Sequence, residues 1–432
     1  MHVHLAFGKT GLPAVLPEGY DYRLLEARSA TPLEDPLLSL ERAIDAPIAS
    51  PGLRDLARGK KTAAISVCDI TRPAPNRTVL PIVLKRLEEG GIPPSQVTIL
   101  IATGLHRPAT DAEINEIVGE ITAQRVRVVN HNARELAEHR HLGATSTGTP
   151  VYIDERFASA DLRITLGFIE PHLMLGFSGG RKLVAPGLAA QETIKVLHSP
   201  KFMREPKATE GSIDDNPLHR ELLEIARMAG HDFIVDVALT RDRRIAGVFA
   251  GHPEEAHKAG VGFVQRVMLE QMAEPVDAVI TTSAGYPLDL TYYQAIKGVT
   301  AAQHIVKPGG KILLIAECQE GPGAPEFRRM LKENPDAKQY LEKIRHTPVE
   351  VDQWQIEKLA LVMEKARVAF YVPGLDAEYY PTLWGPAYAT LSEALHHFFD
   401  DLPKGAKVAV IPEGPYVLAK AGITTDTTAG FS

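Results

Sequence analysis

The sequence predicts an α/β fold with two domains, each built on a mostly parallel sheet flanked by helices. At 432 residues the chain is longer than a single hydrophobic core usually grows. Apolar strand patterns alternate with helical ones, and this order is typical of parallel βαβ units. The alternation starts afresh after residues 270–276. We therefore expect one domain over residues 1–270 and another over residues 275–432, with the last residues packing back on the first domain.

The first half alternates strands and helices after an irregular opening. The pattern predicts, in order, a strand in 61–75, a helix in 76–93, a strand in 95–108, a helix from 110, a strand in 160–172 and a helix in 187–199. The first strand ends near Asp69, and the last helix ends at His198. Thr110 and Glu113 have the spacing of a capping box, which marks a helix start.

The second half repeats this order. The pattern predicts a strand in 276–287, a helix in 292–306, a strand in 309–317, a long helical stretch across 325–347, and strands in 366–372 and 406–414. The loop Gly285 to Leu290, which follows the first of these strands, is expected to carry ligand contacts. We expect the active site in the cleft between the two domains.

Composition narrows the class of protein. The net charge is -7 and no basic run exceeds three residues, so a nucleic-acid-binding role is not indicated. The only cysteines, Cys68 and Cys318, cannot build a disulfide framework or a multi-cysteine metal site. The start has no charged and apolar leader, and no apolar run reaches membrane length. We expect a cytoplasmic protein that acts on a small molecule; the sequence does not indicate an oligomeric state.

Polar side chains follow three of the predicted strands directly. Asp69 and Arg72 follow the first strand, His106 the second and His172 the third. Ligands of open α/β sheets bind beyond the carboxyl ends of the strands, so these loops are expected to meet at one edge. Each histidine alone is more simply a turn residue, but the group favours a site. Arg72 could equally be a surface loop charge, but its guanidinium at a strand end is well suited to bidentate capture of a substrate carboxylate.

The run Ser178-Gly179-Gly180-Arg181-Lys182 invites a nucleotide interpretation. It is not a P-loop, because an arginine precedes Lys182 and a leucine follows it. Its glycines would let backbone amides approach a phosphate, with Arg181 or Lys182 supplying charge, and a plain flexible turn is the alternative. A dinucleotide glycine pattern is also missing.

In the second domain, Tyr293, Gln294 and Lys297 fall on the first turns of a predicted helix. They would suit an anionic, hydroxylated substrate or would face solvent. Two other histidine groups are predicted to be solvent-facing. We place His131, His139 and His141 on a solvated helical face, and His252 and His257 on an exposed helix start.

Taken together, six segments resemble the nickel-dependent lactate racemase family, with its 2-hydroxyacid racemases and epimerases, over most of the chain. They are FGKTGL, DITRP, ATGLHRP, EPHLMLGFSGGRKLVAPG, KVLHSP and YYQAIKG. The resemblance implies a nickel-pincer nucleotide, pyridinium-3,5-bisthiocarboxylic acid mononucleotide, which Lys182 can bind covalently or by charge. It implies that His198 is the nickel ligand and that His106 and His172 are the acid/base pair. The implied cofactor contacts are Asp69, Ser178, Gly179, Gly180 and Arg181, and the implied substrate contacts are Arg72, Tyr293, Gln294 and Lys297.

The implied reaction is inversion of a 2-hydroxy acid through transient hydride transfer to the cofactor. Two histidines are needed because each enantiomer presents its hydroxyl on a different side, and imidazole titrates near working pH. Lactate, malate, aromatic and sugar-derived 2-hydroxy acids all fit. An NAD-type 2-hydroxyacid oxidoreductase and a non-catalytic binder of the cofactor are the alternatives.

Overall fold

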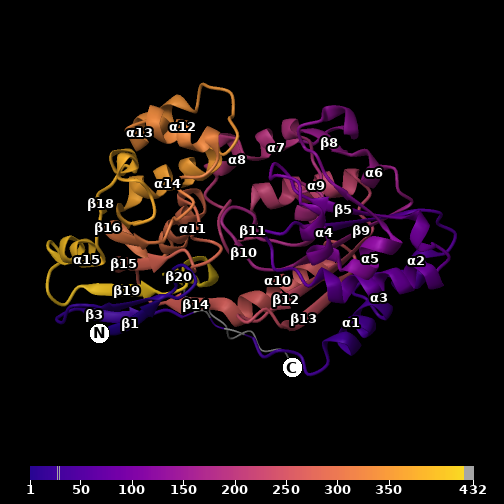
Figure 1. Cartoon of the computed structure of the whole chain (residues 1–432), viewed down its shortest axis with the longest axis horizontal. Helices are drawn as coiled ribbons and strands as arrows, with labels where there is room; N and C mark the ends of the chain where they lie inside the picture. The colour runs from indigo at the N-terminus through magenta and orange to yellow at the C-terminus, as the bar shows by residue number, and fades with distance from the viewer. Residues whose placement is uncertain (27, 29, 423–432) are drawn as a thin grey trace. The chain divides into compact units, whose positions relative to one another are not determined.

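In the computed structural model, which describes residues 1–26, 28 and 30–422, the chain divides into two units (Figure 1). One spans Ser29–Val267, and the other combines Met1–Arg28 with the chain from Met268 onward. Each holds a six-stranded sheet with helices packed against it. The predicted α/β class is therefore confirmed.

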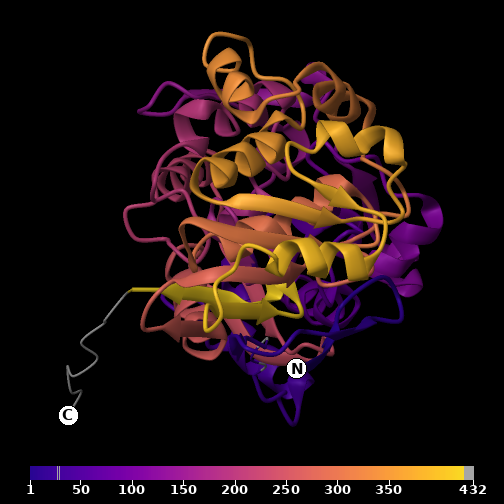
Figure 2. The same cartoon turned by 90° about the vertical axis from the view of Figure 1, so that its left-hand side faces the viewer.

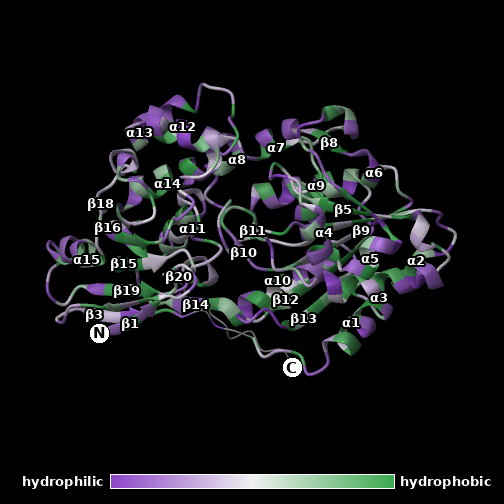
Figure 3. Cartoon of the chain, in the orientation of Figure 1, coloured by the Kyte–Doolittle hydropathy of each residue, from purple (hydrophilic) through white to green (hydrophobic). Residues whose placement is uncertain are grey.

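The sheet of the Ser29–Val267 unit has the strand order β13-β12-β9-β4-β5-β6. All neighbours are parallel except β12 and β13, which pair antiparallel. Its apolar strands are coloured green in Figure 3. The strands are β4 (Ala63–Cys68), β5 (Val97–Ala102), β6 (Arg127–Asn130), β9 (Leu162–Phe168), β12 (Phe233–Leu239) and β13 (Ile245–Gly251).

The helices of this unit begin and end where their sequence signals lie. Thr110 and Glu113 form the predicted capping box, and Gly90 caps the helix after β4. The helices are α1 (Pro36–Asp45), α2 (Leu53–Ala57), α3 (Asn76–Glu89), α4 (Asp111–Val118), α5 (Glu120–Arg125), α6 (Glu155–Ala158), α7 (Gln191–Leu197), α8 (Pro200–Met203), α9 (Pro217–Met228) and α10 (Glu255–Met268).

Two hairpins complete the unit and correct the histidine predictions. β7 (His139–Ala144) pairs with β8 (Pro150–Asp154), and β10 (Pro171–His172) pairs with β11 (Gly176–Phe177). The solvated helical face predicted for His131, His139 and His141 is wrong, because His139 and His141 lie on β7, which its pairing with β8 makes extended, and His131 is buried after β6. The exposed position predicted for His257 is also wrong, since its side chain is buried on α10.

The sheet of the second unit is parallel throughout, in the order β18-β17-β16-β15-β19-β3. Figure 2 shows its strands side by side, with helices packed against them. The strands are β3 (Asp21–Leu24), β15 (Val276–Thr282), β16 (Val306–Ile315), β17 (Arg367–Tyr371), β18 (Ala387–Tyr388) and β19 (Lys407–Ile411). Here β14 (Leu269–Met272) also pairs with β20 (Leu418–Ala421).

The first 28 residues differ from the expected division, which placed them with residues up to 270. β3 pairs with β19, and the hairpin of β1 (His2–Leu5) and β2 (Leu12–Val15) is tied on by the Ala6 amide, which donates to the Pro412 carbonyl. The physical reason is burial, because Leu5 and Leu16 lie in a core cluster built from strands of this sheet. Of the last residues, expected to pack on the other domain, 423–432 lie outside the described chain.

The helices of the second unit are α11 (Tyr292–Ala302), α12 (Pro325–Glu333), α13 (Ala337–Lys343), α14 (Gln353–Lys365) and α15 (Leu391–Phe399). The helical stretch predicted across 325–347 is thus two helices. It breaks at Asn334, because Pro335 disfavours the helical conformation of the preceding residue and has no amide hydrogen. Among all helices of the described chain, none is both long and apolar enough to cross a membrane.

Candidate active site

The strand order of the Ser29–Val267 unit places the predicted site residues at one sheet edge. The chain leaves β4 toward β5 and β6 on one side, then returns to β9 and β12 on the other. Such a reversal opens a crevice for ligands beyond the carboxyl ends of the strands. Asp69, His106 and His172 follow β4, β5 and β9, which are adjacent strands. The shared edge predicted from the sequence is therefore confirmed.

Asp69 orients His106. Its Oδ2 lies 2.6 Å from Nδ1 of His106, and its Oδ1 accepts a hydrogen bond of 2.6 Å from the Thr71 hydroxyl. Burial raises the pKa of Asp69, but the hydrogen bond and charge of His106 and the charge of Arg72 outweigh it and lower the pKa. An ionised Asp69 keeps the hydrogen on Nδ1 of His106. His106 thus presents Nε2 as a base.

His172 sits on the short hairpin of β10 and β11. The amide nitrogens of Met174 and Leu175 lie 3.5 and 3.4 Å from its Nδ1, as long contacts in which Nδ1 accepts. This arrangement favours a hydrogen on Nε2 of the neutral ring. Both rings are therefore held through Nδ1, His106 by a carboxylate and His172 by backbone amides.

The side chains of Ser178 and Arg181 hold this hairpin in place through hydrogen bonds to backbone groups in and next to it. The Ser178 hydroxyl donates to the Phe168 carbonyl at 2.8 Å and accepts from the Glu170 amide at 3.0 Å. Arg181 is 1% exposed, and its guanidinium donates to the carbonyls of Leu175 and Phe177, each at 3.1 Å. Burial lowers the pKa of Arg181 to about 9. Both side chains were predicted to contact the cofactor, but the geometry assigns them to the hairpin that carries His172.

The two glycines of the same turn pass close to a buried carboxylate. Gly179 and Gly180 have φ of +86° and +45°. A Cβ on Gly179 would lie 2.6 Å from Oδ2 of Asp236, which is fully buried. Burial raises the pKa of Asp236 to about 7, against the opposing effects of the Gly180 amide and the Arg181 charge. Only glycine fits here, because both the backbone conformation and the space exclude a side chain.

We expect Gly179→Ala to destabilise the protein more than Gly148→Ala. Gly148 has a similar φ of +90°, but a Cβ there would meet nothing within 4 Å. Left-handed strain alone costs about 1–2 kcal/mol. The clash with Asp236 should add about 1–3 kcal/mol at Gly179. Urea unfolding of both variants measures the difference, and equal losses would show that the turn yields to the added methyl.

Lys182 and His198 form a second pair in this unit. Lys182 lies in the short helix Gly180–Leu183, and burial, helped by the charge of Arg72, lowers its pKa to about 7. His198 caps the end of α7, and its Nδ1 lies 2.8 Å from the Ile194 carbonyl. Burial and, to a smaller extent, the charge of Lys182 lower the pKa of His198 to about 4, against the opposing effect of the hydrogen bond to Ile194. The ring is therefore neutral at neutral pH, with the Nδ1 hydrogen donated to Ile194 and Nε2 unprotonated.

This chemistry fits the implied cofactor. Neutral imidazole is a common metal ligand, and a hydrogen bond from its other nitrogen to a carbonyl fixes the metal-binding nitrogen. No group of three or more histidine, cysteine, aspartate or glutamate side chains that could hold a metal occurs in the described chain. A nickel ion at His198 would thus take its other donors from a bound organic ligand, as a pincer cofactor provides.

In the second unit, the predicted substrate contacts gather at the start of α11, after the loop that follows β15. Trp354 donates to the Tyr293 hydroxyl at 3.1 Å, a partner that the sequence did not reveal. Within the part of the chain that the structure describes, Oε1 of Gln294 is buried without a hydrogen-bond partner. Lys297 lies three residues further along the same helix. A buried amide oxygen without a partner is a ready acceptor for a ligand hydroxyl.

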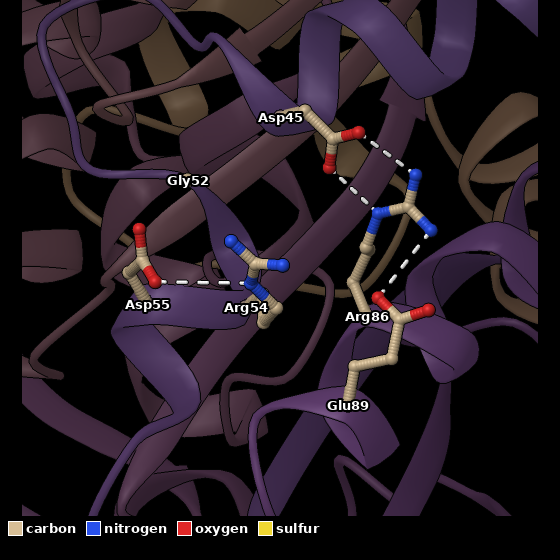
Figure 4. A pocket seen from close by; sticks show the side chains of 6 residues that line it. All are labelled: Asp45, Gly52, Arg54, Asp55, Arg86 and Glu89. Atoms are coloured by element: carbon tan, nitrogen blue, oxygen red, sulfur yellow. Dashed lines mark hydrogen bonds and ion pairs between the residues drawn. The ribbon is translucent and has the colours of Figure 1, made fainter.

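A cavity of about 340 Å³ lies elsewhere, at the ends of α1 and α3 and along α2 (Figure 4). Ion pairs line it, such as Arg86 to Asp45 at 2.6 Å and Arg86 to Glu89 at 3.5 Å. Glu89 ends α3 and so lies toward the amino ends of the strands. None of the predicted site residues lines this cavity, and its charges are already paired.

Comparisons with known proteins agree with the resemblance. A family model described as lactate racemase N-terminal domain matches residues 7–211, and one described as lactate racemase C-terminal domain matches residues 271–419. A lactate racemase from Lactiplantibacillus plantarum is 37% identical over 385 residues, or 88% of this chain and 90% of its own. One from Thermoanaerobacterium thermosaccharolyticum is 34% identical over 426 residues, or 97% and 99%.

Solved structures give the same match. The lactate racemase apoprotein from Thermoanaerobacterium thermosaccharolyticum has a TM-score of 0.90 and 34% identity, covering 97% of this chain and 100% of its own. A protein from Thermotoga maritima has a TM-score of 0.66 at 16% identity, covering 89% and 97%. The second likeness shows the fold alone.

Proposed function

Because this chain is an isomerase that belongs to the lactate racemase family, we propose that it inverts the α-carbon of a lactate-like 2-hydroxy acid. The arrangement of His106 supports this proposal independently of the family assignment. Asp69 holds His106 with Nε2 as a base, on the strand edge that also presents His172. A reaction that takes a hydroxyl proton on one side and returns it on the other needs such a pair.

We propose that Lys182 and His198 hold the nickel-pincer nucleotide, His198 as the nickel ligand through Nε2. Near neutral pH the Lys182 amine is divided between its unprotonated form, which allows covalent attachment, and its protonated form, which allows charge pairing. When bound, this cofactor supplies the acceptor of the α-hydrogen, as hydride, and its donor on return. With Ser178 and Arg181 engaged by the hairpin and the Gly180 amide directed at Asp236, the backbone amide of Gly179 is the proposed phosphate contact.

The side chains of the protein then transfer the hydroxyl proton and bind the substrate. His106 takes the hydroxyl proton of one enantiomer through Nε2, and Asp69 stabilises the resulting imidazolium at 2.6 Å. His172 acts on the opposite side: as an imidazolium it returns a proton to the substrate oxygen, and in the reverse direction the neutral ring takes the hydroxyl proton of the other enantiomer. Arg72 is the proposed carboxylate contact. Tyr293, Gln294 and Lys297 are the further proposed substrate contacts, with the buried Gln294 oxygen accepting a substrate hydrogen.

The proposal is tested by following single enantiomers of 2-hydroxy acids in deuterated water with protein loaded with cofactor. We expect inversion with the α-hydrogen retained, because a hydride does not exchange with solvent. Deuterium at the α-carbon would instead indicate proton abstraction. Keto-acid formation that depends on added NAD would favour an oxidoreductase, and tight cofactor binding without turnover of any acid would favour a binder.

A further inference from the structure

His131, which the proposed reaction does not use, has an unusual pair of neighbours. It follows β6, and its side chain is fully buried. Its Nδ1 lies 3.0 Å from Oδ2 of Asp154, and its Nε2 lies 3.1 Å from the carbonyl oxygen of Ala189. A carboxylate and a carbonyl only accept hydrogen bonds, so each ring nitrogen must donate. A neutral ring carries one N–H, and either tautomer would turn a lone pair toward an oxygen.

The surroundings of His131 stabilise a positive charge. Burial raises the pKa of Asp154 on β8, but hydrogen bonds from Arg156 and His131 outweigh it and hold the pKa at about 2. Arg156 in turn donates to Glu138 at 2.7 Å. The network of two cations and two anions is therefore balanced. The ring of His139 packs edge-on at 5.0 Å, and burial and the charge of His131 lower its pKa, so it stays neutral.

The carbonyl that His131 holds belongs to the segment joining Lys182 to His198. Ala189 is followed by Ala190, the residue that caps the start of α7, and His198 caps the end of that helix. The same segment is tied to β8, because the Asp154 amide donates to Leu188 at 2.9 Å. It also touches the loop that carries His106, since the Gly104 amide donates to Gly187 at 3.1 Å.

We propose that His131 is a charged positioning residue: its imidazolium, anchored by Asp154, fixes the Ala189 carbonyl and thereby the placement of Lys182 and His198. The link to the cofactor rests on the proposed function, in which these two residues hold it. Asp154 and Arg156 act with His131 as one unit, because removing either anchor leaves a buried charge without its partner.

Ring protonation tests the first half of the proposal in the unmodified full-length apoprotein. Nitrogen NMR of labelled histidines distinguishes rings with one and with two N–H groups, and the His131 signals are those missing from His131→Gln. Because both nitrogens of His131 face acceptors, its ring is expected to carry two hydrogens at neutral pH and the ring of His139 one. Asp154→Asn should reduce His131 to one. A singly protonated His131 in the unmodified protein would overturn the inference.

Amide hydrogen exchange tests the second half, with His139→Gln as the matched control. Losing a charge-assisted hydrogen bond should speed exchange across residues 186–198 by about tenfold in His131→Gln and by less than about twofold in His139→Gln. Nickel release from cofactor-loaded protein should accelerate in the same variant only. Unchanged exchange would overturn the positioning role. If His131→Gln does not fold, Asp154→Asn gives the same readout. Since neither measurement needs turnover, this inference and the proposed racemisation can fail separately.

Discussion

Replacing His106 by alanine is expected to lower kcat/KM about 10²- to 10⁴-fold with either enantiomer, the range for loss of a general acid or base. The factor must be the same in both directions, because no variant changes the equilibrium constant of the reaction. His172→Ala is expected to do the same. Cofactor absorption and nickel content should stay unchanged in both, since neither histidine is proposed to hold the metal. Chiral chromatography of the product measures the rates.

Single-turnover experiments separate the two histidines. The variant without His106 should form bound keto acid from only one enantiomer, and the variant without His172 from only the other. Asp69→Asn should resemble the loss of His106, because an amide neither fixes the tautomer nor stabilises the imidazolium at 2.6 Å. The control is His141→Gln, an exposed ring stacked on Tyr152. If His106→Ala kept more than about a tenth of the activity, its role as the base would be refuted.

The fold was predictable where its signals are local. Strand and helix periods, the capping box at Thr110 and the glycine after α3 fixed most elements of the α/β core. The first 28 residues were not predictable, because β3 is four residues long and gains its partner, β19, almost 400 residues later in the chain. Pairing of that kind depends on tertiary contacts rather than on local propensity.

The sequence was enough to predict which edge of the sheet carries the site. The interactions of the individual side chains were only partly predictable. Alternating strands and helices predict a parallel sheet whose strands end at one edge, and so Asp69, His106 and His172 were expected together. That Asp69 holds His106, or that Arg181 turns toward carbonyls of the hairpin, depends on side-chain direction in the folded chain. The segment around Arg181 contains glycines and positive charges. Such a composition is compatible with a phosphate-binding loop and equally with a buried turn.

Replacing Lys182 by methionine is expected to abolish retention of the cofactor and yet to stabilise the apoprotein. The amine is buried beside the charge of Arg72, and its pKa is lowered to about 7. In the unfolded chain Lys182 is exposed to water and fully protonated at neutral pH, whereas in the folded chain burial disfavours the protonated amine. This difference stabilises the unfolded state. Methionine keeps a similar length without the charge. We expect a gain of about 2–4 kcal/mol in the free energy of unfolding at pH 7, measured in urea.

The dependence on pH identifies the cause. Between the folded pKa near 7 and the unfolded value of 10.5, the unfolded state binds more protons, so the stability of the unmodified apoprotein rises with pH. The advantage of Lys182→Met should therefore be largest at or below pH 7 and vanish as the pH approaches the unfolded value. Lys258→Met, an exposed lysine on α10, should show no such trend. If the difference in unfolding free energy between Lys182→Met and the unmodified protein does not change with pH, the amine is solvated in the apoprotein. If the difference decreases as the pH rises, Lys182 lowers the stability of the apoprotein and is kept because it holds the cofactor.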